Sequence, residues 1–285
     1  MERKRSILEG FIAGFSFGSA AIIIRLLEGV NAYTIAVMRL IIASLALIVI
    51  SMIRADLSEL FKFRAELIPL GAFLGLHLVF FIMSVKDTSV MNATVLVNTA
   101  PILTMIIGVS LFKIRASIED VMLVLMAFSG ALMIAYPDLS HEGKLIGDLE
   151  AIISALLESI YLNLGSKFRR KTDPISLMIP VFILAAFTAS IAAHLTGTSL
   201  RLPLEIRTIA LILALGLIPT AIGHTLYFSS LKGLRSFETA TMALLEPISA
   251  SIIAVFLFGE IPSLWSVAGS ALTLSAVFLV SLRKL

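Results

Sequence analysis

Five polar or ionisable residues lie near the middle of long apolar stretches, where a polar group is costly to bury. A charge at the centre of a membrane-spanning helix costs about 2.5–3.5 kcal/mol on insertion scales, so each such residue needs a partner or a function. The five come from separate stretches and lie at similar depths: His77, Asn98, Glu158, His224 and Glu246. Gathered together, carboxylates, imidazoles and an amide can bind a small polar molecule, and an ionisable acid can exchange a proton.

Each of these stretches has one semi-polar face at helical spacing. Residues three or four apart share a helix face, as Ser154, Glu158 and Tyr161 do. The other faces are His77-Phe81-Ser84, Thr94-Asn98-Pro101, Thr220-His224-Tyr227 and Thr239-Met242-Glu246-Ser249. The pattern predicts a water-accessible pocket at the membrane midplane, with hydrogen-bonding groups and a few aromatic rings. The alternative is that the Asn, His and Ser side chains hydrogen-bond between helices for packing alone.

The two acids have different surroundings in the sequence. Glu158 is the leading candidate for a titratable group, which would pair with a cationic substrate or exchange a proton. Glu246 precedes Pro247, and a proline within a helix lacks an N–H and displaces the carbonyl four residues back. Pro101 is the counterpart of Pro247 in an earlier stretch, so we expect both helices to bend at the pocket. The alternative is a purely structural kink, with Glu246 hydrogen-bonded to a facing helix.

Arg39 lies about six residues inside the outer end of its apolar stretch, at a depth of roughly 9 Å. There it can attract an anionic group of a substrate, such as a carboxylate. Two structural alternatives remain open, because a long side chain can extend to the interface or form an ion pair within the protein.

Composition identifies the elements that hold these residues as membrane-spanning helices. Of 285 residues, 59% are hydrophobic and 14% charged, against about 45–50% and 25% in an average soluble domain. This excludes a soluble globule. A span needs about 20 apolar residues, and ten candidate spans follow: 7–27, 33–53, 66–85, 90–112, 118–136, 148–167, 175–195, 207–230, 237–258 and 264–282. We expect an all-α, multi-pass protein of the cell (plasma or inner) membrane, in contact with the lipid bilayer.

The distribution of Lys and Arg predicts the orientation. Sixteen lie on the side that holds both chain ends and five on the other, with Arg39 inside a span. By the positive-inside rule both termini are cytoplasmic. The basic residues show no run with interleaved aromatic residues, so we expect no nucleic-acid partner.

An internal repeat divides the chain into residues 1–140 and 141–285. With an offset of 146 residues, the twelve residues from Pro101 to Phe112 align without a gap with those from Pro247 to Phe258, and seven are identical. Each half holds five spans, and an odd number makes the second half enter the membrane from the opposite face. Such inverted repeats are typical of secondary transporters, whose substrate site lies near the midplane between the halves.

Several motifs resemble a known family. Leu245-Glu246-Pro247 followed by Phe258-Gly259-Glu260 is the most specific, and Met38-Arg39-Leu40, Gly147-Asp148-Leu149 and Gly223-His224-Thr225 add to it. The chain resembles the ten-helix EamA-type permeases of the drug/metabolite transporter superfamily. The resemblance implies transport of small metabolites such as amino acids, commonly outward. The sequence departs from the family at Lys113-Ile114, where the second half has Gly259-Glu260, and at Glu158, where family members often carry Trp.

Motifs for other chemistry are missing from the sequence. There is no phosphate-binding loop, no H-E-x-x-H metal motif and no G-x-S-x-G nucleophile elbow. The absence of Cys excludes disulfides, thiolate catalysis and Cys-based metal sites. We therefore predict no catalytic residue, metal or cofactor, and leave the oligomeric state open.

The hypothesis that follows is a secondary transporter, and an exporter by family resemblance. It would move a small metabolite by alternating access around the midplane pocket, with protons as the candidate coupling ion. Its predicted substrate-binding residues are Arg39, His77, Asn98, Glu158, Tyr161, His224 and Glu246. Two alternatives are kept. An intramembrane enzyme acting on a lipid-linked substrate would need paired catalytic groups at interface depth, and a channel would show no saturable counterflow.

Overall fold

The computed structural model describes residues 2–54, 65–136, 145–169, 173–258 and 262–283, and every regular element in these ranges is a helix. The first five-span half contains α1 (Glu2–Leu26), α2 (Ala32–Ile53), η1 (Ala65–Leu67), α3 (Ile68–Asp87), α4 (Val90–Val97), α5 (Ala100–Phe112) and α6 (Ile118–Ala135). The second contains α7 (Leu145–Arg169), α8 (Pro174–Leu195), α9 (Ile206–Leu215), η3 (Gly216–His224), α10 (Thr225–Ser230), α11 (Ser236–Ala243), α12 (Glu246–Phe258) and α13 (Leu264–Leu282). Gly259 and Glu260 of the family motif lie outside the described residues.

The all-α fold predicted from the sequence is confirmed, and every predicted span coincides with one helix or with consecutive helices. Within the described ranges, nine of these segments are long and apolar enough to cross a membrane. The remaining one is α7, which has 25 residues and carries five charged side chains. Helix α7 packs against α3, α4 and α5, and three of its charged residues, Glu150, Glu158 and Arg169, are buried in the bundle.

Short polar side chains begin many of the helices. A side-chain oxygen that accepts a hydrogen bond from the first turn satisfies a backbone N–H that has no partner within the helix. Asn31 accepts from Thr34 N at the start of α2, and Ser89 accepts from Asn92 N at the start of α4. Asp173 and Ser263 cap α8 and α13 in the same way. The helix boundaries are therefore set by local sequence as well as by hydropathy.

The two kinks expected at Pro101 and Pro247 are complete breaks in the helices. Helix α4 ends at Val97 and α5 begins at Ala100; α11 ends at Ala243 and α12 begins at Glu246. Val97 and Ala243 are 146 residues apart, and so are Ala100 and Glu246. This is the offset that relates the repeated sequence segments. Tighter backbone bonds close each break, from Thr99 N to Leu96 O (3.2 Å) and from Leu245 N to Met242 O (3.2 Å).

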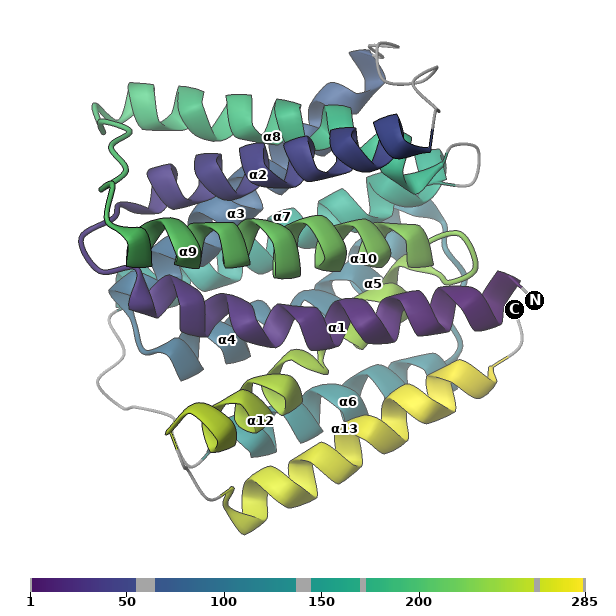
Figure 1. The fold of residues 1–285 in the computed structure, drawn as a ribbon. Helices are drawn as coiled ribbons and strands as arrows, with labels where there is room; N and C mark the ends of the chain where they lie inside the picture. The colour runs from purple at the N-terminus through teal and green to yellow at the C-terminus, as the bar shows by residue number, and fades with distance from the viewer. Residues whose placement is uncertain (1, 55–64, 137–144, 170–172, 259–261, 284–285) are drawn as a thin grey trace.

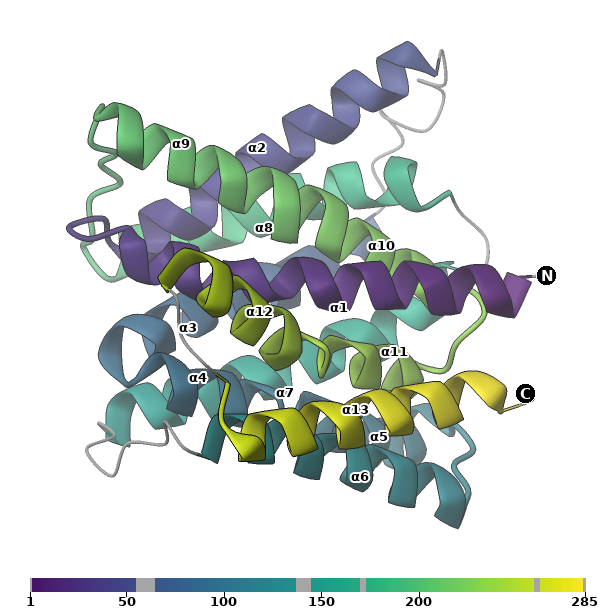
Figure 2. The same cartoon turned by 60° about the horizontal axis from the view of Figure 1, so that its bottom comes forward.

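The helices run side by side as one bundle (Figure 1). Helix α1 packs against η3, α10, α11 and α12, whereas α6 and α13 pack mainly against each other. The start of α1 and the end of α13 lie at the same end of the bundle (Figures 1 and 2), as an even number of spans requires. We call this end the terminal end.

Small residues let α1 lie directly against the broken helix. Gly14 and Gly18 lie one turn apart on α1, where small residues allow the backbones to approach closely. A Cβ atom added at Gly14 would overlap the carbonyl oxygen of Met242, and one added at Gly18 would overlap the side chain of Ser249. The α1–α12 contact therefore fixes the position of the segment that carries Glu246.

We predict that Gly14→Ala lowers the stability of the protein by about 1–3 kcal/mol, the usual cost of an overpacked interior, because the added methyl group meets backbone. Gly10→Ala is the matched control, since its methyl group would lie 2.8 Å from Cγ of the flexible Met242 side chain. Thermal unfolding of the two purified variants measures the difference. Equal melting temperatures for both variants would contradict this account of the contact.

Candidate functional site

Six of the seven predicted site residues line one cavity inside the bundle. Its volume is about 40 Å³, measured as the space open to the centres of water molecules, which is room for a few waters. Its polar lining residues are Arg39, His77, Asn98, Glu158, His224 and Glu246, contributed by α2, α3, α7, η3, α12 and the break between α4 and α5. Phe17, Phe81 and Pro101 are among its apolar lining residues.

Tyr161, the seventh predicted residue, is not a lining residue of this cavity. Its side chain is buried, and its hydroxyl donates to Sδ of Met178 at 3.6 Å. Its ring packs on Phe228, with the ring centroids 5.9 Å apart. The shared helix face places Tyr161 one turn from Glu158, but its side chain belongs to the packing between α7, α8 and α10.

Glu158 has one direct partner in the site. The hydroxyl of Tyr227 donates a hydrogen bond to Oε1 of Glu158 at 3.0 Å, between α7 and α10. Both side chains are buried. A carboxylate can accept this bond in its charged form, and a protonated carboxyl group can accept it through its remaining lone pairs. The pair therefore allows Glu158 to gain or lose a proton without losing its partner.

The two histidines lie near each other, with ring centroids 6.1 Å apart. His77 Nδ1 lies 3.0 Å from the carbonyl oxygen of Ser154, and the Ser154 hydroxyl can donate back to the His77 carbonyl at 3.1 Å. Because a carbonyl only accepts, this contact is a hydrogen bond in the tautomer that carries its proton on Nδ1, and the Ser154 hydroxyl also lies 2.9 Å from Nδ1. His224 stacks at a tilt on Phe17, at 4.9 Å between centroids.

Arg39 does not extend to the interface, which answers one of the alternatives from the sequence. Its side chain is 1% exposed, and Nε donates to Oγ1 of Thr220 at 2.8 Å. Thr220 lies in η3, a π-helical segment in which its hydroxyl donates to the carbonyl of Leu215, five residues back. Such π-helical insertions are common at functional sites, and here the insertion supplies the acceptor for a buried guanidinium.

Four polar atoms of the lining residues have no hydrogen-bond partner among the described residues. They are Nη1 of Arg39, Nδ2 of Asn98, Nδ1 of His224 and Oε1 of Glu246. An unsatisfied buried polar group costs about 1–3 kcal/mol, and more when it is charged. The cavity therefore offers hydrogen-bond donors and an acceptor to whatever occupies it.

The sequence pattern placed Phe81 on a pocket face but did not predict Phe17 as a site residue. Phe17 lines the cavity and packs edge-on against Tyr227 at 5.2 Å as well as on His224. Helix α1 has no ionisable residue near its middle, so a search for buried charge passes over it. The available signal was a single large aromatic residue on the helix face of Gly14 and Gly18.

Nothing in the described part of the chain assembles a metal centre. No group of three or more His, Asp or Glu side chains there could hold a metal ion. Glu158 and His77 lie near the middle of α7 and α3.

Comparison with known proteins agrees with this arrangement. The EamA-like transporter family matches two segments, residues 4–136 and 145–282. An uncharacterized transporter of Bacillus subtilis, YdfC, is 27% identical over 271 residues, covering 90% of this chain and 84% of that protein. An uncharacterized transporter of Archaeoglobus fulgidus is 23% identical over 205 residues, covering 71% of this chain and 70% of that protein.

A crystal structure with 18% sequence identity has the same fold. It superposes with a TM-score of 0.82 and covers 99% of this chain and 100% of the other. The family matches together span nearly all of the chain, including every residue that lines the central cavity. This chain is a multi-pass membrane protein that belongs to the EamA-like transporter family.

Proposed function

We propose that this protein is a secondary transporter that exports a small zwitterionic metabolite, such as an amino acid, by alternating access. The observation that carries the proposal is the set of unpartnered polar atoms around one central cavity, with a guanidinium on one helix and a carboxyl group on another. We place the protein in the plasma or inner membrane with both termini in the cytoplasm, and propose that its halves are inverted repeats. The outward direction rests on family resemblance.

The charges in the cavity are complementary to a zwitterion. Nη1 of Arg39 and Nδ2 of Asn98 are donors suited to a carboxylate, and Oε1 of Glu246 is an acceptor suited to an ammonium group. No carboxylate oxygen of the described residues lies within 4.0 Å of the Arg39 guanidinium, so the two charges are not used up in an ion pair with each other. Phe17 and Phe81 supply apolar surface for a side chain.

The size of the cavity supports alternating access. Small-molecule sites are typically about 300–1,000 Å³, and a cavity of about 40 Å³ has no room for an amino acid. The bundle must therefore open to load its substrate. The half-helices α4/α5 and α11/α12 meet the cavity at their breaks, and broken helices at the midplane are the moving and binding parts of many transporters.

Proton coupling is proposed for Glu158. Its only hydrogen bond among the described residues comes from Tyr227, and no Lys, Arg or His nitrogen there lies within 4.0 Å of its carboxyl group. An acid held this way can change its protonation state when the cavity opens to water on either side.

The two alternative functions fit the site less well. An intramembrane enzyme would need paired catalytic groups at interface depth, whereas Glu158 and His77 of this cavity lie near the middle of their helices. A channel would need a continuous opening.

We expect Glu158→Gln to abolish the response of transport to a pH gradient while leaving exchange of substrate for substrate active. The reason is that the amide keeps the shape and accepts from Tyr227 but cannot carry a proton. Uptake and counterflow of labelled amino acids in proteoliposomes measure both activities. A full rate with unchanged pH dependence would rule out the proposed role of Glu158.

Tyr227→Phe tests the same pair from its other side, with Tyr161→Phe as the matched control outside the cavity. Loss of the hydrogen bond to a carboxyl group removes about 0.5–3 kcal/mol of interaction, so the pH midpoint of transport should move in Tyr227→Phe. It should stay in place in Tyr161→Phe, whose hydroxyl has its one hydrogen bond among the described residues to Met178. A common midpoint in both variants would contradict the pairing.

Substitutions of Arg39 and Glu246 test which of these residues binds the carboxylate and which binds the ammonium group of the substrate. Arg39→Gln should weaken binding of an amino acid about tenfold or more and affect its decarboxylated amine much less, because a charge-assisted hydrogen bond contributes about 1.5–3 kcal/mol. Glu246→Gln should weaken binding of the amine as well. Thermal stabilisation of the purified protein by each ligand reports affinity. Equal losses for both ligands in both variants would contradict the assignment of ends.

A further inference from the structure

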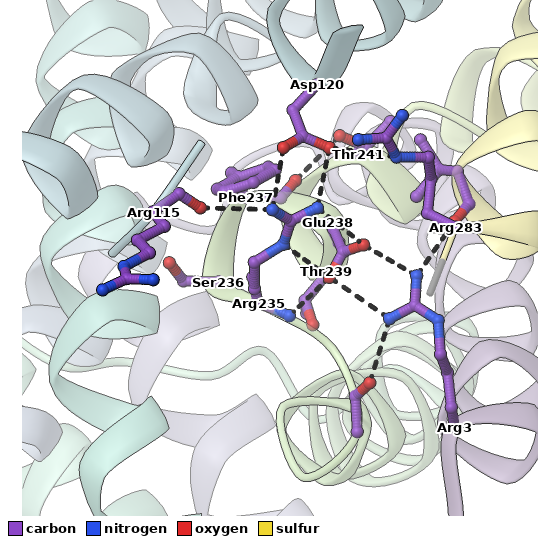
Figure 3. A network of polar contacts seen from close by, with 12 residues as sticks. Arg3, Arg115, Asp120, Arg235, Ser236, Phe237, Glu238, Thr239, Thr241 and Arg283 are labelled. Atoms are coloured by element: carbon purple, nitrogen blue, oxygen red, sulfur yellow. Dashed lines mark hydrogen bonds and ion pairs between the residues drawn. The ribbon is translucent and has the colours of Figure 1, made fainter. Parts of the chain in front are cut away.

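A second cluster of charges lies at the terminal end of the bundle, away from the cavity. Figure 3 shows it where α1, α6, α11 and α13 come together. We call it the terminal network and define it by six residues: Arg3, Glu119, Asp120, Arg235, Glu238 and Arg283. The function proposed above makes no use of these residues.

Glu238 is the acidic centre of the terminal network. Its side chain is 2% exposed and accepts from Nη2 of Arg3 at 2.7 Å and from Nη2 of Arg235 at 3.2 Å. It also accepts from the backbone N–H of Arg235 at 2.7 Å, which caps the first turn of α11. Arg3 continues to the carbonyls of Gly233 (3.2 Å) and Val280 (3.0 Å). Through Glu238, the start of α11 is bound to the start of α1.

Asp120 binds the other side of Arg235. Nη2 and Nη1 of Arg235 donate to its two carboxylate oxygens at 2.7 and 2.8 Å, in a bidentate pair, and Arg283 lies 3.6 Å away. Arg283 also pairs with Glu119. Burial lowers the pKa of Arg235, but the hydrogen bonds to Asp120 and Glu238 outweigh it and hold the pKa above its usual value. The start of α11 is thus bound to α6 as well, and α6 to α13.

The helix that the terminal network fixes leads directly to the cavity. Helix α11 has eight residues, all buried, and Ala243 at its far end lines the cavity next to the break before Glu246. Because α11 is short and interrupted there, it can move as a unit separate from α12. Any path from the cavity to the terminal end that displaces α11 must first break bonds made by Glu238 and Arg235.

The residues that correspond to three members of the terminal network carry no charge. With the offset of 146 residues, Ser89 corresponds to Arg235, Asn92 to Glu238 and Ser266 to Asp120. Helix α4 begins with a neutral cap, in which Ser89 accepts from the Asn92 N–H at 3.0 Å. Of the two matching half-helices, α11 thus begins with buried ion pairs and α4 begins with an uncharged serine cap.

We propose that the terminal network is a latch that closes the terminal end of the transport pathway, and that the uncharged counterparts of Arg235, Glu238 and Asp120 make the two closed ends unequal in stability. This rests on the proposed transport function. With the latch formed, the protein favours states closed at the terminal end. Breaking the latch lets α11 separate from α1 and α6 and admits water to the cavity from that end.

The absence of Cys from the chain provides a direct test by cysteine labelling. Ala100 lines the cavity on α5, and Ala100→Cys introduces a single thiol there. Lys4→Cys, which is exposed on the first turn of α1, identifies which face of oriented membrane vesicles is the terminal side. A membrane-impermeant maleimide is added to that side, and the labelling rate of Ala100→Cys is compared with and without Glu238→Gln.

We expect Glu238→Gln to raise the labelling rate from the terminal side about tenfold or more. A tenfold shift needs about 1.4 kcal/mol, and breaking a buried charge pair removes more than this. Arg3→Gln, on the partly exposed partner, should shift the rate in the same direction and covers the case in which Glu238→Gln does not fold. The control is Arg5→Gln, which removes an ion pair to Glu9 within α1 at the same end and should leave the rate unchanged.

The readout is independent of substrate. If labelling rises but no amino acid is transported, the latch stands and the substrate assignment is wrong. If transport is normal and labelling stays unchanged in both Glu238→Gln and Arg3→Gln, the latch is wrong. An equal rise in the Arg5→Gln control would also overturn it, since any loss of charge at this end would then have the same effect.

Discussion

A helix inside a membrane cannot pass through proline without losing a backbone hydrogen bond, and the lost bond must be replaced within the protein. Pro101 and Pro247 impose this constraint at the same place in both halves, and both helices break two residues before the proline-bearing helix resumes. The breaks place Asn98 and Glu246 beside the cavity. They also divide each span into two short helices that can move separately, which is the basis of the proposed function and of the proposed latch.

At this site, closely packed helices occur together with buried polar atoms that have no hydrogen-bond partner among the described residues. Gly14 and Gly18 bring α1 against α11 and α12. Buried polar groups in such close contacts usually have hydrogen-bond partners. Around the cavity, atoms of Arg39, His224 and Glu246 do not find partners among the described residues. If these residues served only for packing, apolar residues in their places would make the fold more stable. Their presence around a cavity with room for only a few waters is what favours a binding role.

Sequence pattern predicted the spans and most of the site, because hydropathy and buried charge are local signals. Tyr161 does not line the cavity because its side chain packs against Met178 and Phe228 on neighbouring helices, a tertiary contact that helical spacing alone does not reveal. The π-helical segment that turns Thr220 toward Arg39 has no signal in a single sequence. Phe17 reaches the cavity only through the tertiary packing of α1.

A count of Lys and Arg in the sequence does not distinguish exposed positive residues at the terminal end from those that form ion pairs with buried acids. Arg3, Arg235 and Arg283 belong to the excess of Lys and Arg that predicts orientation, and that count treats them as equivalent to the exposed Lys4. In the fold they are unequal, since these three arginines reach buried or half-buried acids on other helices. Two similar halves would by themselves make the two closed ends similar in energy. Among the described residues these paired charges gather at the terminal end, so in the proposed latch a few side chains, rather than the fold, set the preference between conformations.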